Sequence, residues 1–83
     1  MRTNGAEMEE NKDITIKDTQ FIGRLIKKRR KELGITQRQL ADMSGLSFNG
    51  ISQVELGRME IRISSLIKIG QLLGLKLKIE VEN

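Results

Sequence analysis

The sequence predicts a mostly α-helical, compact domain of four or five helices, followed by one C-terminal β-strand. Three observations support this prediction. Apolar residues recur at spacings of three and four between residues 18 and 74, which is the period of an amphipathic helix. Glycines punctuate these stretches, and no proline interrupts any of them. Residues 75–82 then alternate between apolar and charged side chains, which is the period of a strand with one buried face.

The composition narrows the classes of function. A chain of 83 residues forms one domain, and small domains bury so little surface that oligomerisation is a reasonable expectation. The chain has no cysteine and no histidine, so disulfides and thiolate metal sites are excluded and no metal or cofactor is expected. It also has no long apolar run and no signal-peptide pattern, so a cytoplasmic location is expected.

The charge is distributed unevenly along the chain. The net charge is +4, but acidic side chains outnumber basic ones up to residue 20, and the reverse holds after it. A basic body suits a polyanionic partner such as nucleic acid. For individual side chains such as Lys27, Lys28 and Lys31, a solvated helix face is the better interpretation.

Residues 1–17 are predicted to be a flexible N-terminal tail, because they are polar and lack periodicity. Within them the triplet Ile14–Ile16 is β-prone but too short to predict a strand alone. Residues 18–74 are predicted to form the helical domain. Its first helix begins at Asp18 and ends at Gly34, with one stripe made by Phe21, Ile22, Leu25, Ile26, Arg29 and Leu33.

A second helix is predicted to begin at Thr36, because Thr36 and Gln39 have the spacing of a capping box. It ends near Gly45, and its inner face is formed by Leu40, Ala41 and Met43. A third helix begins after Ser47, which is a good N-cap residue, and ends at Gly57.

The fourth helix is predicted over "ISSLIKIGQLL", residues 63–73, and it ends at Gly74. Residues 75–83 form the predicted dimerisation strand, with an apolar face made by Leu75, Leu77, Ile79 and Val81.

Residues 37–56 resemble the helix-turn-helix unit of the phage repressor and Cro type, the XRE-like family. The resemblance depends on a small Ala41, on Gly45 in the turn, and on Ile51 and Val54 in the second helix of the unit. The flanking sequences "KELGITQ" and "ELG" also fit. The resemblance covers about residues 21–74 and implies a phage-repressor-like domain whose second unit helix enters the DNA major groove. An unrelated helical hairpin is the alternative.

Four side chains face away from Ile51 and Val54 and are the candidate base readers: Phe48, Asn49, Ser52 and Gln53. Asn49 and Gln53 are the best of them, because an amide can bond adenine through two hydrogen bonds. The alternative is an ordinary solvated helix face. Phe48 either contacts a thymine methyl or folds against its own helix. Gly50 lies inside the predicted helix, where a glycine is about 0.5–1 kcal/mol less favourable than alanine. Either a close approach to DNA requires this glycine, or the loss of stability is simply tolerated.

Candidate phosphate contacts lie around this helix, at Gln37, Arg38, Arg58 and Arg62. For Gln37 the family position suggests that its backbone N–H and its side-chain amide both meet a phosphate. The family also commonly pairs an arginine and a glutamate at the positions of Arg30 and Glu55. We therefore interpret these two residues as a structural ion pair.

The C-terminal strand predicts a second copy of the chain. A lone strand leaves its backbone groups unpaired and its apolar face exposed, and antiparallel self-pairing sets Lys76 and Lys78 against Glu82 and Glu80. A homodimer also suits a palindromic DNA operator with half-sites ~34 Å apart. The layout resembles antitoxins of the HipB type, which implies autoregulation and a HipA-like kinase toxin as a further partner.

The sequence therefore predicts a sequence-specific transcriptional repressor. The alternatives are a stand-alone XRE-family regulator, or a protein-interaction module that no longer binds DNA. An enzyme is not predicted, because no nucleophile–base pair, metal constellation or phosphate loop is found.

Overall fold

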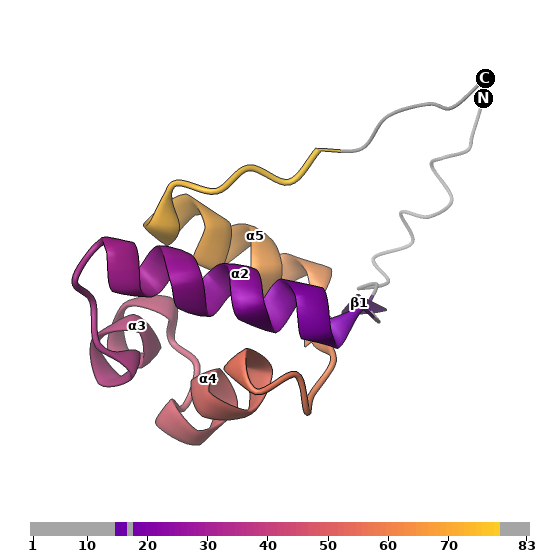
Figure 1. Cartoon of the computed structure of the whole chain (residues 1–83), viewed down its shortest axis with the longest axis horizontal. Helices are drawn as coiled ribbons and strands as arrows, with labels where there is room; N and C mark the ends of the chain where they lie inside the picture. The colour runs from indigo at the N-terminus through magenta and orange to yellow at the C-terminus, as the bar shows by residue number, and fades with distance from the viewer. Residues whose placement is uncertain (1–14, 17, 79–83) are drawn as a thin grey trace.

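The computed structural model describes residues 15–16 and 18–78. The described chain forms four helices and one short two-stranded sheet (Figure 1). The mostly α-helical fold predicted from the sequence is confirmed. The elements in chain order are β1 (Thr15–Ile16), α2 (Thr19–Glu32), α3 (Gln37–Ser44), α4 (Phe48–Glu55), β2 (Ile61–Arg62) and α5 (Ile63–Leu73).

The helix ends lie where the capping signals predict. The Asp18 carboxylate accepts the Phe21 N–H, and the Ser47 hydroxyl accepts the Gly50 N–H. At Thr36 the full capping box forms, because the Thr36 hydroxyl accepts from the Gln39 backbone and the Gln39 side chain accepts from the Thr36 backbone. These local hydrogen bonds satisfy donors that the first helical turn leaves free.

The N-terminal boundary differs from the prediction. Thr15 and Ile16, which we assigned to a flexible tail, form β1 and pair antiparallel with β2. Thr15 lies opposite Arg62, and Ile16 lies opposite Ile61. Two residues on each side are too few for a periodic signal, so only the tertiary pairing identifies these strands.

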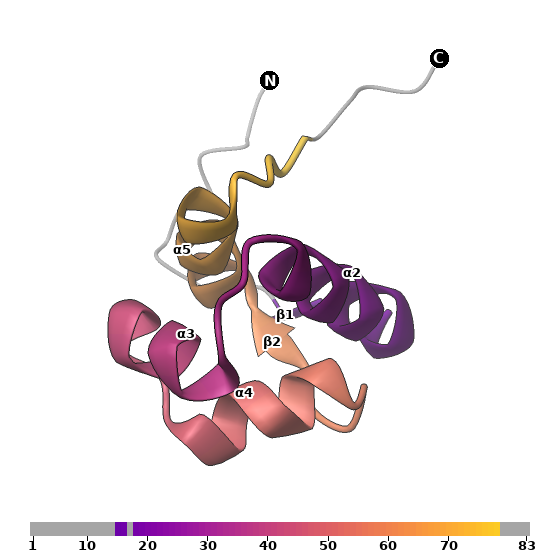
Figure 2. The ribbon, with the colours of Figure 1, turned by 60° about the vertical axis from the view of Figure 1, so that its left-hand side comes forward.

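The core lies where the four helices meet (Figure 2). Its fully buried large side chains come from every helix and are Ile26, Leu40, Ile51, Ile69 and Leu73. Met43 was predicted to face inward, but it is 45% exposed, so that prediction is wrong. Helix α3 is only two turns long, and Leu40, Ala41 and Ser44 already fill its buried side.

Helices α2 and α4 approach each other closely at Gly23. A Cβ atom on Gly23 would lie 2.3 Å from the carbonyl oxygen of Val54 and 2.9 Å from that of Glu55. Only a hydrogen fits there, and this close contact fixes how the first helix crosses α4.

After α5 the chain turns back over the helix. Gly74 adopts a left-handed conformation, and the Leu75 N–H donates to the Gly70 carbonyl at 2.8 Å. Leu75 is half-buried against the core of its own chain. Residues 75–78 pair with no strand among the described residues. Ile79 and Val81 of the predicted strand lie outside the described residues, so its pairing stays a prediction.

Within the described ranges, no helix combines the length and the apolar character needed to cross a membrane.

Candidate nucleic-acid interface

Helices α3 and α4 form the two-helix unit that the sequence suggested. The turn between them contains Gly45, which has φ +78° and donates its N–H to the Ala41 carbonyl. Ala41 is buried, and Ile51 and Val54 are buried on the inner side of α4. All four structural positions of the unit therefore lie as predicted.

The outer side of α4 is available to a partner. Phe48 and Asn49 are exposed at the start of the helix, whereas Ser52 and Gln53 are half-buried further along it. Figure 2 shows α4 on one side of the molecule and α5 on the opposite side, with α3 packed against both. A long polymer such as DNA can therefore lie along α4 without meeting α5.

Phe48 is in contact with α3. The Arg38 guanidinium carbon lies 4.8 Å from the centre of the Phe48 ring, in a cation–π arrangement. Neither of the two roles suggested for Phe48 included this contact. A predicted phosphate contact and a predicted base reader are thus held side by side, across the turn that joins α3 to α4.

Arg30 and Glu55 form the predicted ion pair, and the pair is bidentate. The Arg30 Nε donates to Glu55 Oε2 at 2.6 Å and its Nη2 donates to Oε1 at 2.9 Å, while Nη1 donates to the Ile35 carbonyl at 2.8 Å. Both residues are buried. Hydrogen bonding to Glu55 raises the pKa of Arg30, and its charge attraction adds to this; together they outweigh the opposing effect of burial.

Gln37 extends this network instead of pointing freely outward. Its Nε2 donates to Glu55 Oε1 at 3.0 Å, so the side-chain amide that we expected to meet a phosphate is engaged with the protein. Gln37 is the first residue of α3, where the backbone N–H has no acceptor within the helix. The network joins α2, α3 and α4 and holds the N-terminus of α3 against the C-terminus of α4.

The two remaining candidate arginines follow α4. Arg58 lies in the turn after the helix and donates its N–H to the Gln53 carbonyl, and Arg62 lies in β2 directly before α5. Both side chains are exposed. Neither has an ion-pair partner in the part of the chain that the structure describes.

A family model described as Helix-turn-helix (HTH_3) matches residues 26–79. The chain belongs to this helix-turn-helix family. Its XRE-type members are DNA-binding transcriptional regulators, which agrees with the exposed α4 and the basic side chains around it.

Solved structures agree with the family. A crystal structure of the clp gene regulator ClgR from Corynebacterium glutamicum is 30% identical, with a TM-score of 0.67, over 69% of this chain and 61% of that chain. A second ClgR structure is 27% identical, with a TM-score of 0.70, over 80% of this chain and 85% of that chain. The restriction-modification controller protein C.AhdI from Aeromonas hydrophila is 25% identical, with a TM-score of 0.67, over 71% of this chain and 86% of that chain. No curated protein matches the sequence.

Three further features of this helix-turn-helix protein were not predicted. Gly23 is a buried residue of α2, and a glycine inside the helix was the available signal for a close helix crossing. Thr19 donates its hydroxyl to the Gly57 carbonyl at 2.9 Å, which joins the start of α2 to the end of α4. A Cβ on Gly50 would lie 3.0 Å from the Ser47 hydroxyl oxygen, so the N-cap restricts this position.

Proposed function

We propose that the chain is a sequence-specific transcriptional repressor that reads DNA through the outer side of α4. Asn49 and Gln53 contact base edges, with Phe48 and Ser52 beside them. Arg38, Arg58 and Arg62, together with the backbone N–H of Gln37, contact phosphates. The observation that supports this best is the exposed start of α4, where Asn49 lies next to a Phe48 ring already held by Arg38.

The charge of the interface supports the same reading. Arg58 and Arg62 are exposed and lie in the turn after α4 and in β2, respectively. Glu55, the acidic residue of α4, is neutralised by Arg30 on the buried side of the helix. The outer side of α4 therefore presents amide, hydroxyl and aromatic groups flanked by cations, which suits a groove lined by phosphates.

Base reading is tested with Asn49→Ala and selection of bound duplexes from a random pool. We expect a loss of about 1–3 kcal/mol in affinity and a relaxed preference at one base pair. Gln71→Ala is the matched control, because it removes an exposed amide from α5, and it is compared on a single half-site. If Asn49→Ala kept both affinity and base preference, the proposed readout would be wrong.

Phosphate contact is tested by the salt dependence of binding. Arg58→Gln and Arg62→Gln should each weaken all sequences alike and lower the salt slope by about one. Lys31→Gln removes the same charge from the outer side of α2 and should leave the slope unchanged. Equal slopes for all three variants would contradict the assignment of the arginines.

Within this function, we propose that the protein is a homodimer that represses its own operon and acts as the antitoxin of a HipA-like kinase. The supporting feature is the direct passage from α5 into an alternating C-terminal segment. A stand-alone regulator is the second candidate, because the similar solved structures are described as a gene regulator and a controller protein. Co-expression with a HipA-like kinase from a neighbouring gene separates the two, since only an antitoxin restores growth and co-purifies with the kinase.

A further inference from the structure

An open apolar groove lies between α2, α5 and residues 75–78, and it has a volume of about 910 Å³. Its floor is formed by buried side chains such as Ile26 and Leu66. Its walls carry large apolar side chains that stay exposed, among them Phe21 at 51% and Ile67 at 44%. A contiguous apolar surface of this kind marks an interaction site more often than a free surface.

The two helical walls of the groove are regular ridges. Phe21 and Leu25 are four positions apart on α2, so they lie on one face of that helix. Ile63 and Ile67 line the groove with the same spacing on α5. Figure 1 shows the two helices side by side. Because helices pack by laying ridges of side chains into grooves, the shape favours a third helix as the occupant.

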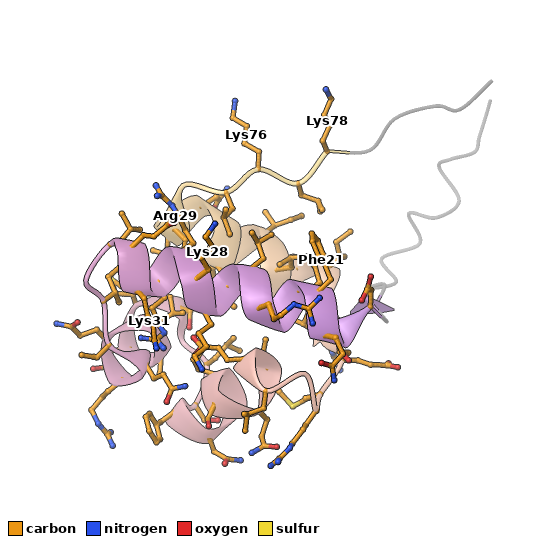
Figure 3. The ribbon with its side chains drawn as sticks, in the orientation of Figure 1. Phe21, Lys28, Arg29, Lys31, Lys76 and Lys78 are labelled. Carbon is orange, nitrogen blue, oxygen red and sulfur yellow. The ribbon has the colours of Figure 1, made fainter. Side chains whose placement is uncertain are left out.

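Cations stand on both borders of the groove. Beside the α2 ridge, a shallower hollow is lined by Arg24 and Lys28. On the other border Lys76 and Lys78 line the groove, and Figure 3 shows both pointing away from the helices. None of the described residues that line the groove or the hollow is acidic. A matching occupant therefore carries anions on both sides of its apolar face.

The acidic residue Glu32 lies one turn beyond Lys28 on α2, and it is already paired. Its carboxylate lies 3.9 Å from the Lys28 Nζ and 3.4 Å from the Arg29 Nη1. Lys28 and Glu32 are exposed, so their pairing is weak, and the Lys28 ammonium keeps donors for a further carboxylate. The α2 border of the groove thus stays basic.

We propose that this groove binds an acidic amphipathic helix of a partner protein. The apolar stripe of that helix lies between the two ridges. Carboxylates on one flank meet Arg24 and Lys28, and those on the other flank meet Lys76 and Lys78. Recognition of this kind combines apolar anchors at helical spacing with complementary charges at the rim. The inference goes beyond DNA reading and does not depend on it.

Charge separates this occupant from the other candidates. Two copies of the groove placed face to face would set cations against cations. A small anionic amphiphile carries its charge at one end, whereas the cations here lie on both borders. A helix with an apolar stripe between two acidic flanks matches both borders at once.

The position of the groove is compatible with DNA binding. Figure 2 shows α5 and α4 on opposite sides of the molecule. A partner helix held between α2 and α5 therefore leaves the outer side of α4 uncovered, so DNA and the partner can bind together.

A designed peptide serves as the probe. It has about 18 residues, which is long enough to form a helix in water, with a leucine stripe at helical spacing and glutamates on both flanks. A second peptide has lysine in place of every glutamate, and a third has the composition of the first in an order that breaks the stripe. Fluorescence anisotropy with the full chain should show the first peptide binding about tenfold more tightly than either of the others. Added salt should weaken this binding.

Ile67→Gln tests the apolar wall of the groove. It should weaken binding of the acidic peptide about tenfold, because it removes an exposed apolar anchor, and it should leave the helical circular dichroism unchanged. Met43→Gln is the matched control, because Met43 is almost equally exposed but lies on α3, outside the groove. It should leave peptide binding unchanged.

Arg24→Glu combined with Lys76→Glu reverses one cation on each border. This variant should bind the acidic peptide about tenfold more weakly than the parent, and the lysine peptide about tenfold more tightly. Lys27→Glu combined with Lys31→Glu makes the same change in net charge, but neither side chain lines the groove or the hollow. This control should alter both affinities far less. Equal effects of the two double variants would indicate general attraction between charges and overturn the proposed borders.

Binding of a single DNA half-site is measured on the same samples, and neither the peptide nor Ile67→Gln should change it. If the acidic peptide bound no better than the other two peptides, the inference would fail, whether or not the chain bound DNA. In that case, dissociation of a dimer by Ile67→Gln in sedimentation experiments would assign the groove to contact between copies. Loss of binding to phosphatidylglycerol vesicles would assign it to a membrane surface instead.

Discussion

The α3–α4 unit and the surface between α2 and α5 both carry large apolar side chains, but only the unit buries them. In the unit, the apolar residues Ile51 and Val54 are buried, and the helix ends are capped by Thr36 and Ser47. In the groove, large apolar side chains such as Phe21 and Ile67 remain exposed. The chain thus buries the apolar side chains of the unit by itself, whereas it leaves those of the groove exposed.

The largest effect is expected where the unit is tied to the rest of the domain. Glu55→Ala leaves the Arg30 charge buried without a partner and removes the acceptor of Gln37, so the free energy of unfolding should fall by about 3–5 kcal/mol. Urea unfolding at fixed protein concentration measures this. Met43→Ala is the control: it lies in the same unit but is exposed, and should change stability by less than about 0.5 kcal/mol.

A loss of this size could unfold so small a domain, and a second variant keeps the test decisive. Arg30→Met combined with Glu55→Leu removes both charges together, and should recover most of the lost stability because a buried pair is often replaceable by apolar residues. If the double variant were as unstable as Glu55→Ala, the loss would come from packing around Glu55 and not from the uncompensated charge.

Gly23→Ala should have the next largest effect. The new Cβ would overlap the Val54 carbonyl oxygen, so α2 must move away from α4, at a cost of about 2–3 kcal/mol. Thermal and urea unfolding both report the loss. Gly50→Ala is the matched control in α4, and its gain in helix propensity of about 1 kcal/mol should largely offset crowding at Ser47. Equal stability of the two variants would show that α2 and α4 do not depend on this close contact.

The sequence predicted the unit better than the groove, because the signals of the unit are local. A capping residue and the donor it satisfies are three positions apart, so the Thr36–Gln39 capping box could be predicted from its spacing and Ser47 from its residue type. The partner of Arg30 was predicted through the family resemblance.

Contacts between elements could not be predicted in this way. The β1–β2 pair joins two dipeptides that are far apart in the sequence, and the Arg38–Phe48 contact depends on the angle between two helices. Met43 followed the helical period, yet α3 is too short to bury it. In the candidate site, the sequence predicted which helix faces outward. It did not predict the hydrogen bond from Gln37 to Glu55.

Gly45→Val tests the turn inside the unit and should cost about 1–3 kcal/mol, because a β-branched residue at positive φ is strained. The nearest atom to a Cβ there is the Lys68 Nζ at 3.5 Å, so backbone strain and not crowding is the cause. Gly45→Asn is the matched control and should cost less, since asparagine tolerates the left-handed region. Thermal melting distinguishes them, and equal melting temperatures for the valine variant and the parent would contradict strain at this turn.

The smallest effect is expected at Arg38 and Phe48, and it concerns DNA binding more than folding. An exposed cation–π contact contributes about 0.5–1 kcal/mol, and we expect it to act by holding the Arg38 guanidinium in place for the proposed phosphate contact. Phe48→Leu keeps an apolar side chain but removes the ring face. Binding of one half-site should therefore weaken by about 0.5–1 kcal/mol for all sequences alike.

A double-mutant cycle separates this role from contact with a thymine methyl. If the ring acts by positioning Arg38, Phe48→Leu should have no further effect once Arg38→Ala is present, so the two losses are not additive. If the ring contacts a thymine methyl, leucine largely preserves that contact, and Phe48→Ala should weaken binding only for sites that contain the thymine. Additive losses with a base-specific component would therefore assign Phe48 to readout. Non-additive losses without base preference would make it a positioning residue for the phosphate contact of Arg38.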